Sequence, residues 1–259
     1  MTTLRRQAMA VLQQPDPTRK AAAARALPIE GDVGADEILE EPPGLPGRPA
    51  RPRLVPPASL TQRAVGTPEG RAALLHALAH IEFNAIDLAC DVVWRFHAMP
   101  VAFYRQWLNI AREEALHFEL LREHLRGLGH DYGDFDAHNG LWEMAQKTRH
   151  DLLARLALVP RTLEARGLDA APPIRDKLAR VGDARGAEIL SIILRDEVGH
   201  VAVGNHWYRV LCAERGLDPV TTYAELARVH GAPRLRGPFN LAARRAAGFA
   251  PEELQALEG

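Results

Sequence analysis

Residues 112–117 have the sequence Arg-Glu-Glu-Ala-Leu-His, and residues 195–200 have the sequence Arg-Asp-Glu-Val-Gly-His. Both read arginine, acid, glutamate, two further residues and histidine. In an α-helix, residues three apart lie on one face about one turn apart, so Glu114 can bind an ion together with His117, and Glu197 together with His200. One such motif is common on a solvated helix face. Both copies here stand among apolar residues, where carboxylates and imidazoles without partners are costly, so the pair predicts a buried metal site.

A site for two metal ions in a helical bundle needs a further carboxylate from each of two other helices. Glu82 lies in the apolar stretch HALAHIEFNAIDLACDVVW, and Glu164 lies in LVPRTLEARGLD. Glu82 precedes Glu114 by 32 residues, and Glu164 precedes Glu197 by 33, which suggests two matching helical hairpins. Carboxylate and imidazole ligands suit iron, with manganese as an alternative. We therefore predict two iron ions held by six ligands: Glu82, Glu114, His117, Glu164, Glu197 and His200.

Other carboxylates compete for the two positions outside the motifs. Asp87 and Asp91 are alternatives to Glu82, but they point to other faces of the same predicted helix. Glu143 is an alternative to Glu164, which stands near a helix end after a proline.

The roles of several polar residues near the motifs have two interpretations. Glu113 and Asp196 each precede a ligand glutamate, so they could accept a hydrogen bond from the ligand histidine of the opposite helix, or form ion pairs with nearby arginines. His76 and His80 are spaced as metal ligands can be, although a place in the core or beside the ligands fits them better. Tyr208 lies on a face similar to that of His200 and is expected to pack in the core, with a redox role as the alternative.

Helical periodicity dominates the chain from residue 68, where Thr-Pro-Glu is a typical helix start. It predicts long helices at 68–97, 101–128, 138–167 and 183–215, the third bent by Pro160 and ended by Gly167. Short helices are expected at 3–26, broken near Pro15, within the crossover after residue 167, at 219–230 and at the C-terminus. Residues 27–58 are dense in Pro and Gly and favour an extended path, either disordered or lying along the bundle through anchors such as Leu54. No stretch alternates with period 2, so no sheet is expected.

These elements predict an all-α protein, an up-down four-helix bundle with a long crossover, short helices and a Pro-rich extended segment at the termini. We divide the chain into an N-terminal segment at 1–58 that packs on the bundle, the bundle at 59–232, and a C-terminal loop and short helix at 233–259.

Composition narrows the class of protein. The 259 residues are 47% hydrophobic and carry a formal net charge of −1, which gives no electrostatic case for a nucleic-acid or membrane partner. Cys90 and Cys212 are the two cysteines, far apart in the chain, so a disulfide framework is not expected. No membrane-spanning segment is expected, because no apolar run reaches the roughly 20 residues that a bilayer requires. No signal peptide is expected, because the N-terminus lacks the pattern of one. A soluble cytoplasmic protein is expected.

The sequence also resembles the ferritin-like proteins grouped as domain of unknown function 455. The resemblance covers nearly the whole chain and rests on these stretches: PGRPARPRLVPP, RAALLHALAHIEFNAIDLACDVVWRF, REEALHFELLREHL, HDYGDFDAHNGLWEMAQKTRHDLLARLALVPRTLEARGLD, ILRDEVGHVAVGNHWY and RGPFNLAARRAAGF. It implies a ferritin-like bundle, supports Glu164 within LEARGLD, and implies that the Pro-rich stretch and the C-terminal PFN segment belong to the same domain. More distantly, the ligand scheme is similar to that of tRNA-modifying di-iron hydroxylases.

The function expected from this site is an oxygen-dependent di-iron oxidase or hydroxylase, acting with O2 on a small-molecule substrate that the sequence does not identify. A ferroxidase or peroxide-scavenging protein without an organic substrate is the first alternative, and a non-catalytic metal-stabilised binding module is the second. The neutral charge balance does not favour nucleic acid, although a tRNA substrate stays open, and a homodimer is compatible with the sequence.

Overall fold

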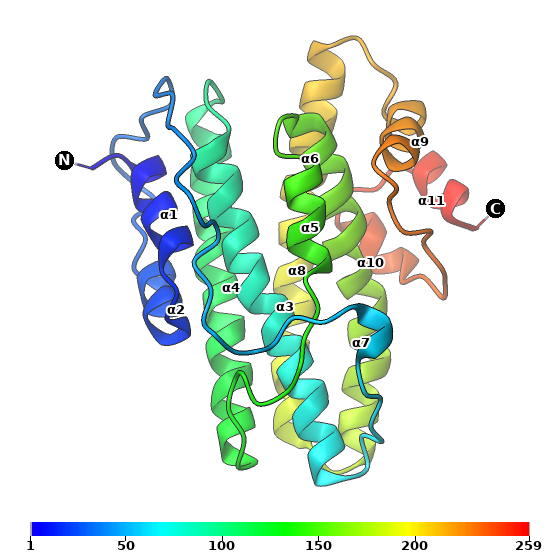
Figure 1. Cartoon of the computed structure of the whole chain (residues 1–259). Coiled ribbons are helices and arrows are strands. Elements are labelled where there is room, and N and C mark those ends of the chain that lie inside the picture. The colour runs from blue at the N-terminus through cyan, green and yellow to red at the C-terminus, as the bar shows by residue number, and fades with distance from the viewer. Residues whose placement is uncertain (1, 259) are drawn as a thin grey trace. The chain divides into compact units, whose positions relative to one another are not determined.

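The computed structural model of the chain describes residues 2–258, which form helices joined by loops (Figure 1). The α-helices are α1 (Leu4–Gln13), α2 (Pro17–Arg25), α3 (Pro68–Arg95), α4 (Val101–Gly127), α5 (Gly140–Lys147), α6 (Leu152–Leu158), α7 (Ala165–Arg180), α8 (Ala184–Glu214), α9 (Pro219–Val229), α10 (Leu241–Ala246) and α11 (Pro251–Glu258). A 3-10 helix, η1, spans Pro57–Ser59, and a π-helix, η2, spans Val159–Glu164. No strand forms among residues 2–258, where the β-type pairing is an isolated bridge between Leu54 and Ala137. The prediction of an all-α protein is confirmed.

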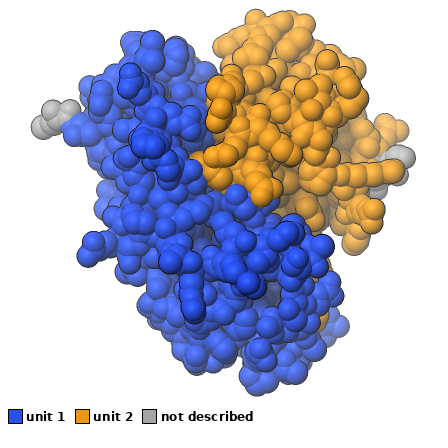
Figure 2. Space-filling view, viewed as in Figure 1, with its two compact units in different colours: residues 1–140, 180–189 blue, residues 141–179, 190–259 orange. Residues whose placement is uncertain are grey.

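The chain divides into two compact units, which Figure 2 shows in different colours. Unit 1 comprises residues 1–140 and 180–189, and unit 2 comprises residues 141–179 and 190–259. Unit 1 thus contains α1–α4, and unit 2 contains η2, α5–α7, the longer part of α8, and α9–α11.

Helices α3 and α4 pack against each other as the centre of unit 1. The side chain of Thr67 accepts a hydrogen bond from Gly70 N at 3.1 Å, and Pro68 occupies the first turn, so α3 begins where the sequence predicted. It ends at Arg95, two residues before the predicted end, and α4 matches its prediction to within one residue. The five residues between the helices make them antiparallel neighbours.

The N-terminal helices and the Pro-rich segment are ordered parts of unit 1. Arg5 is fully buried and donates to the carbonyls of Val93 and Trp94 at 3.2 and 2.6 Å, which satisfies acceptors at the end of α3. The extended segment is bound by its backbone, because Gly47 N donates to Leu12 O and Val55 N donates to Ala137 O, both at 2.8 Å. Leu54, expected as an apolar anchor, is instead 38% exposed, so backbone pairing holds this stretch.

The third predicted long helix, 138–167, is wrong as a continuous element. It is interrupted at residues 148–151, between α5 and α6. Asp151 caps α6 by accepting from Leu153 N at 2.9 Å. The buried Arg155 donates to the Ala145 carbonyl at 2.5 Å and to the Thr148 hydroxyl at 3.0 Å. The first of these bonds satisfies a backbone carbonyl at the C-terminal end of α5.

The bend expected at Pro160 is the π-helix η2. Proline has no amide hydrogen, so the α-helical hydrogen-bond ladder cannot continue through it. The hydroxyl of Thr162 donates to the Ala157 carbonyl at 2.8 Å, and Ala165 N donates to the Pro160 carbonyl, a π-type bond.

The helix end predicted at Gly167 is also wrong, because α7 continues to Arg180 through Pro172 and Pro173. The Leu168 carbonyl can receive no amide hydrogen from Pro172, four residues later. The side chain of Asn240 donates to that carbonyl at 3.2 Å instead. Asn240 therefore supplies the hydrogen bond that Pro172 cannot, and α7 continues beyond this proline.

Helices α8 and α9 agree with their predictions to within one residue at each end. The C-terminal segment forms two short helices, α10 and α11, where one was expected, and it packs into the core of unit 2. Its buried residues join those of α7 and α8 in one cluster: Ala165, Leu168, Val201, Ala247, Phe249 and Leu254.

Helix α3 corrects the expectation that no apolar run could span a membrane, because it is long and apolar enough by length and composition. Its most apolar window is 72% buried within the protein. Such burial is typical of the core helix of a soluble protein, and α3 also carries buried charged groups.

Candidate metal centre

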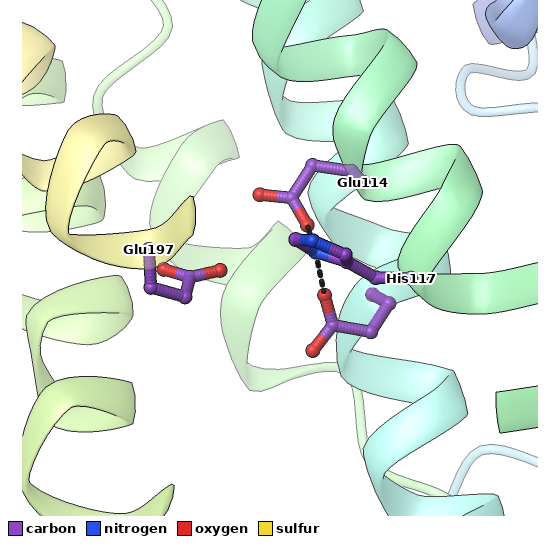
Figure 3. A group of neighbouring side chains, drawn as sticks. Glu114, His117 and Glu197 are labelled. Atoms are coloured by element: carbon purple, nitrogen blue, oxygen red, sulfur yellow. Dashed lines mark hydrogen bonds and ion pairs between the residues drawn. The ribbon is translucent and has the colours of Figure 1, made fainter. Parts of the chain in front are cut away.

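Three of the predicted ligands form a buried cluster in unit 1. Glu82 stands on α3, and Glu114 and His117 stand one turn apart on α4, where Figure 3 shows the last two side chains beside each other. Their exposed fractions are 4%, 1% and 0%. One potential ligand atom from each lies within 4.8 Å of those of the others. The antiparallel packing of α3 on α4 therefore brings a carboxylate from one helix to a carboxylate and an imidazole of the other.

The imidazole of His117 is shared between the two carboxylates. Its Nδ1 atom lies 3.3 Å from Oε2 of Glu82 and 3.4 Å from Oε2 of Glu114. Burial by itself lowers the pKa of His117, but the hydrogen bonds and negative charges of Glu114 and Glu82 outweigh burial and raise the pKa to about 11. Without a metal, the ring is therefore protonated at neutral pH and balances part of the buried negative charge.

This donor set fits a divalent metal ion. Two buried carboxylates and one imidazole carry a net charge that burial makes costly, and a cation offsets that cost. Oxygen and imidazole donors suit iron or manganese better than copper or a structural zinc site. The chemistry and the convergence of the three side chains thus agree with a metal-binding role.

The alternatives to Glu82 are engaged elsewhere in unit 1. Asp87 forms a fully buried ion pair with Lys20 of α2. Asp91 accepts from Trp94 Nε1 at 3.2 Å and pairs with Arg95 at 2.8 Å. Among the acids of α3, Glu82 is therefore the one whose partner is His117.

The remaining predicted ligands belong to unit 2. Glu197, also labelled in Figure 3, and His200 are 8% and 2% exposed on α8, and His200 Nδ1 lies 3.6 Å from Glu197 Oε1. Glu164 is half-buried and is the last residue of η2. Its competitor Glu143 is exposed on α5. The second Glu-x-x-His motif thus forms the buried pair that its spacing predicted, while the six-ligand set as a whole stays a prediction.

The two acids that precede ligand glutamates are half-buried. Glu113 accepts from Asn109 Nδ2 at 2.9 Å, and Asp196 pairs with the adjacent Arg195 at 2.8 Å. The Asp196 contact is the arginine ion pair that the sequence offered as one reading. A hydrogen bond from a ligand histidine to either acid stays a prediction.

Histidines 76 and 80 have core roles in unit 1. His76 Nε2 accepts from Gly133 N at 2.9 Å, and His80 Nδ1 lies 2.8 Å from the hydroxyl of Tyr132. Burial lowers the pKa of His76 to about 4 and that of His80 to about 3, so both rings are neutral. The partner Tyr132 was not singled out from the sequence, because it stands in a loop without a periodic pattern. Tyr208 donates to the Pro219 carbonyl at 2.7 Å, which fits the packing role expected for it.

The chain is similar to a bacterial protein and matches the model of a protein family. A protein of Haemophilus influenzae, described as uncharacterized, is 51% identical over 213 residues, which cover 80% of this chain and 74% of the relative. No solved structure matches the chain. The model of the family described as protein of unknown function (DUF455) matches residues 13–255. The chain therefore belongs to the DUF455 family.

Proposed function

We propose that this protein is an oxygen-dependent di-iron oxidase or hydroxylase with a small organic substrate. In this proposal Glu82, Glu114 and His117 share one dinuclear centre with Glu164, Glu197 and His200, in a ferritin-like four-helix arrangement. The observation that carries it is the buried convergence of Glu82, Glu114 and His117. The repetition of the same motif, again buried, on α8 supports a second ion.

Each ligand has a defined part in the proposal. Two carboxylates and one imidazole from each half give a set whose charge matches two divalent ions. Iron(II) bound by these ligands would supply the electrons that reduce O2. The protein contributes fixed ligand positions and burial, which keeps bulk water from the reacting groups.

The metal content of the protein is the first test. We expect two ions per chain when the protein is purified from iron-supplied cells without chelators and analysed by mass spectrometry of the metals. Glu114→Gln removes one ligand charge with little change in shape and should lose both ions. Glu119→Gln is the matched control, because Glu119 is an exposed glutamate on the same helix, 3.8 Å from Arg25, and it should keep both.

Reaction with O2 separates the proposed function from its alternatives. The iron(II)-loaded protein, mixed with O2 in a stopped-flow instrument, should give a transient absorbance, and incubation with a cell extract should yield an oxidised metabolite. A transient without any oxidised product would favour ferroxidase or peroxide removal. Bound metal without reaction would favour a metal-stabilised binding module, and a single zinc ion would contradict the di-iron centre.

A further inference from the structure

Arg161 of the π-helix η2 is buried in unit 2 to 2% exposure. Its guanidinium lies 4.3 Å from the ring centre of Tyr208, 5.1 Å from that of Phe249 and 5.5 Å from that of Tyr223. Among the described residues, its Nε and Nη1 atoms have no hydrogen-bond acceptor. A buried cation of this kind depends strongly on the few groups that balance its charge.

The carboxylate of Glu253 in α11 balances that charge. Its Oε1 atom accepts from Arg161 Nη2 at 2.5 Å. Its Oε2 atom accepts from Arg209 Nη2 of α8 at 3.1 Å and from Ala250 N at 2.7 Å, so the same group also satisfies a backbone donor at the start of α11. One buried carboxylate thus joins η2, α8 and the C-terminal helix.

The elements that Glu253 joins carry the predicted ligands of unit 2. Glu164 follows Arg161 by three residues and ends η2, and α8 carries Glu197 and His200 before Arg209. Pro160 of η2 packs closely on α8, because a Cβ atom placed on Gly204 would lie 2.6 Å from Pro160 Cβ. The spacing of η2 and α8 therefore depends on contacts made beside the ligands, not by them.

We propose that Glu253 is a positioning residue, which holds η2 against α8 through Arg161 and Arg209 and so sets the distance of Glu164 from Glu197 and His200. This inference rests on the proposed function, because it assigns Glu164, Glu197 and His200 to one ion. It gives the C-terminal helix a role in metal binding although none of its residues is a predicted ligand.

The physical reason is that a charge-assisted hydrogen bond in a buried site, here from Arg161 Nη2 to Glu253 Oε1, is strong and constrains the positions of both side chains. Burial by itself raises the pKa of Glu253, but the charge of Arg161 and the hydrogen bonds from Ala250, Arg161 and Arg209 outweigh it and lower the pKa. The carboxylate is therefore ionised at neutral pH. Without that charge, Arg161 has no carboxylate partner among the described residues, and η2 loses the ion pair that connects it to α11.

Glu253→Gln tests this role with Mn(II) as the probe. In the wild-type protein we expect two Mn(II) ions with the electron paramagnetic resonance spectrum of a coupled pair. In the variant, the first ion should bind as before, while the second should bind about 10- to 100-fold more weakly, as is typical when groups that orient ligands are lost. The coupled spectrum should give way to that of isolated Mn(II) at one equivalent.

Asp169→Asn is the matched control. Asp169 of α7 pairs with the buried Arg244 of α10 at 2.6 Å, so the variant weakens the docking of the same C-terminal segment but leaves Glu253 and Arg161 in place. It should lose stability in urea and keep the coupled pair. Glu253→Asp, which retains the charge on a shorter side chain, should give an intermediate affinity for the second ion and provides a variant that folds if Glu253→Gln does not.

The outcomes separate the inference from the function on which it rests. A coupled pair in Glu253→Gln with wild-type affinities would overturn the positioning role and leave the dinuclear centre standing. Equal loss of the second ion in Asp169→Asn would also overturn it, because docking of the whole segment would then be the cause. Wild-type protein that binds no pair of ions would refute the proposed function, and the positioning role with it.

Discussion

Nδ1 of His117 lies 3.3 Å from Oε2 of Glu82, although 35 residues separate them in the chain. The two side chains come from antiparallel helices, and Glu114 completes the cluster from the turn before His117. This contact links the protonation of a buried histidine to the metal site that we propose at this cluster.

Metal binding should therefore release a proton. His117 has a pKa raised to about 11 and is protonated at neutral pH, and a metal ion bound at its nitrogen must displace that proton. We expect the affinity for Mn(II) to rise about tenfold per pH unit between about pH 6 and pH 8 for each proton released. Calorimetry in two buffers of different ionisation enthalpy measures the proton count, and an affinity independent of pH would contradict the displacement.

Acid should destabilise unit 1 through His76. Burial lowers the pKa of His76 from 6.5 to about 4, despite the nearby carboxylates of Asp134 and Asp131, so the unfolded chain binds the proton more readily than the folded protein. Stability is then lost as the pH falls from 6.5 to about 4, by an amount on the order of 2–3 kcal/mol. His76→Gln keeps an acceptor for Gly133 N but cannot titrate, so urea unfolding of this variant should depend less on pH across that range. An unchanged pH dependence would assign the effect to other groups.

Gly204→Ala should disturb the contact between η2 and α8. The added methyl group would lie 2.6 Å from Pro160 Cβ, so the helix and the π-turn must move apart, at a cost of about 1–3 kcal/mol. Gly199→Ala, in the same helix, meets no atom within 4 Å and should stabilise the protein by about 0.5–1 kcal/mol through helix propensity. Urea unfolding measures the change in the free energy of unfolding for both variants. Changes of the same sign would contradict the prediction.

The buried pair of Lys20 and Asp87 should be strongly coupled. Both side chains are 0% exposed, and Lys20 Nζ also donates to the Gly47 carbonyl at 2.8 Å. Lys20→Met leaves a buried carboxylate without its cation and should cost about 3–5 kcal/mol. The double variant with Asp87→Asn should cost less than the sum of the single ones.

The exposed pair of Arg25 and Glu119, 3.8 Å apart on the same unit, is the control for this double-mutant cycle. Its coupling energy should stay below about 1 kcal/mol, because water screens both groups. Additive effects at Lys20 and Asp87 would show that the buried pair does not act as a unit.

Local sequence signals were sufficient where they acted within one helix. The Thr67 cap and Pro68 fixed the start of α3, and the spacing of Glu114 and His117 placed both side chains on one buried face. The same reasoning located the buried pair Glu197 and His200 on α8. Each depends on residues within about one turn of each other, for which helix geometry leaves little choice.

The other helix bounds depend on contacts between residues that the sequence pattern does not bring together. The predicted helix across 138–167 breaks at 148–151, where Arg155 satisfies the end of α5 from inside the protein. The same prediction ended the helix at Gly167, yet α7 continues because Asn240, 72 residues beyond Leu168, serves the carbonyl that a proline leaves open.

The sequence by itself thus determined the helical class of this protein, the bounds of its longest helices and the two buried Glu-x-x-His motifs, since these follow from periodicity and caps. Helix geometry already favoured Glu82 over Asp87 and Asp91, and only the tertiary structure decided the partner of each carboxylate: His117 for Glu82, Lys20 for Asp87 and Arg95 for Asp91. It also decided that Glu253 meets Arg161 across 92 residues. Burial makes each lone charge costly, so the fold that pairs these charges is favoured, and such pairings become visible only when the helices are packed.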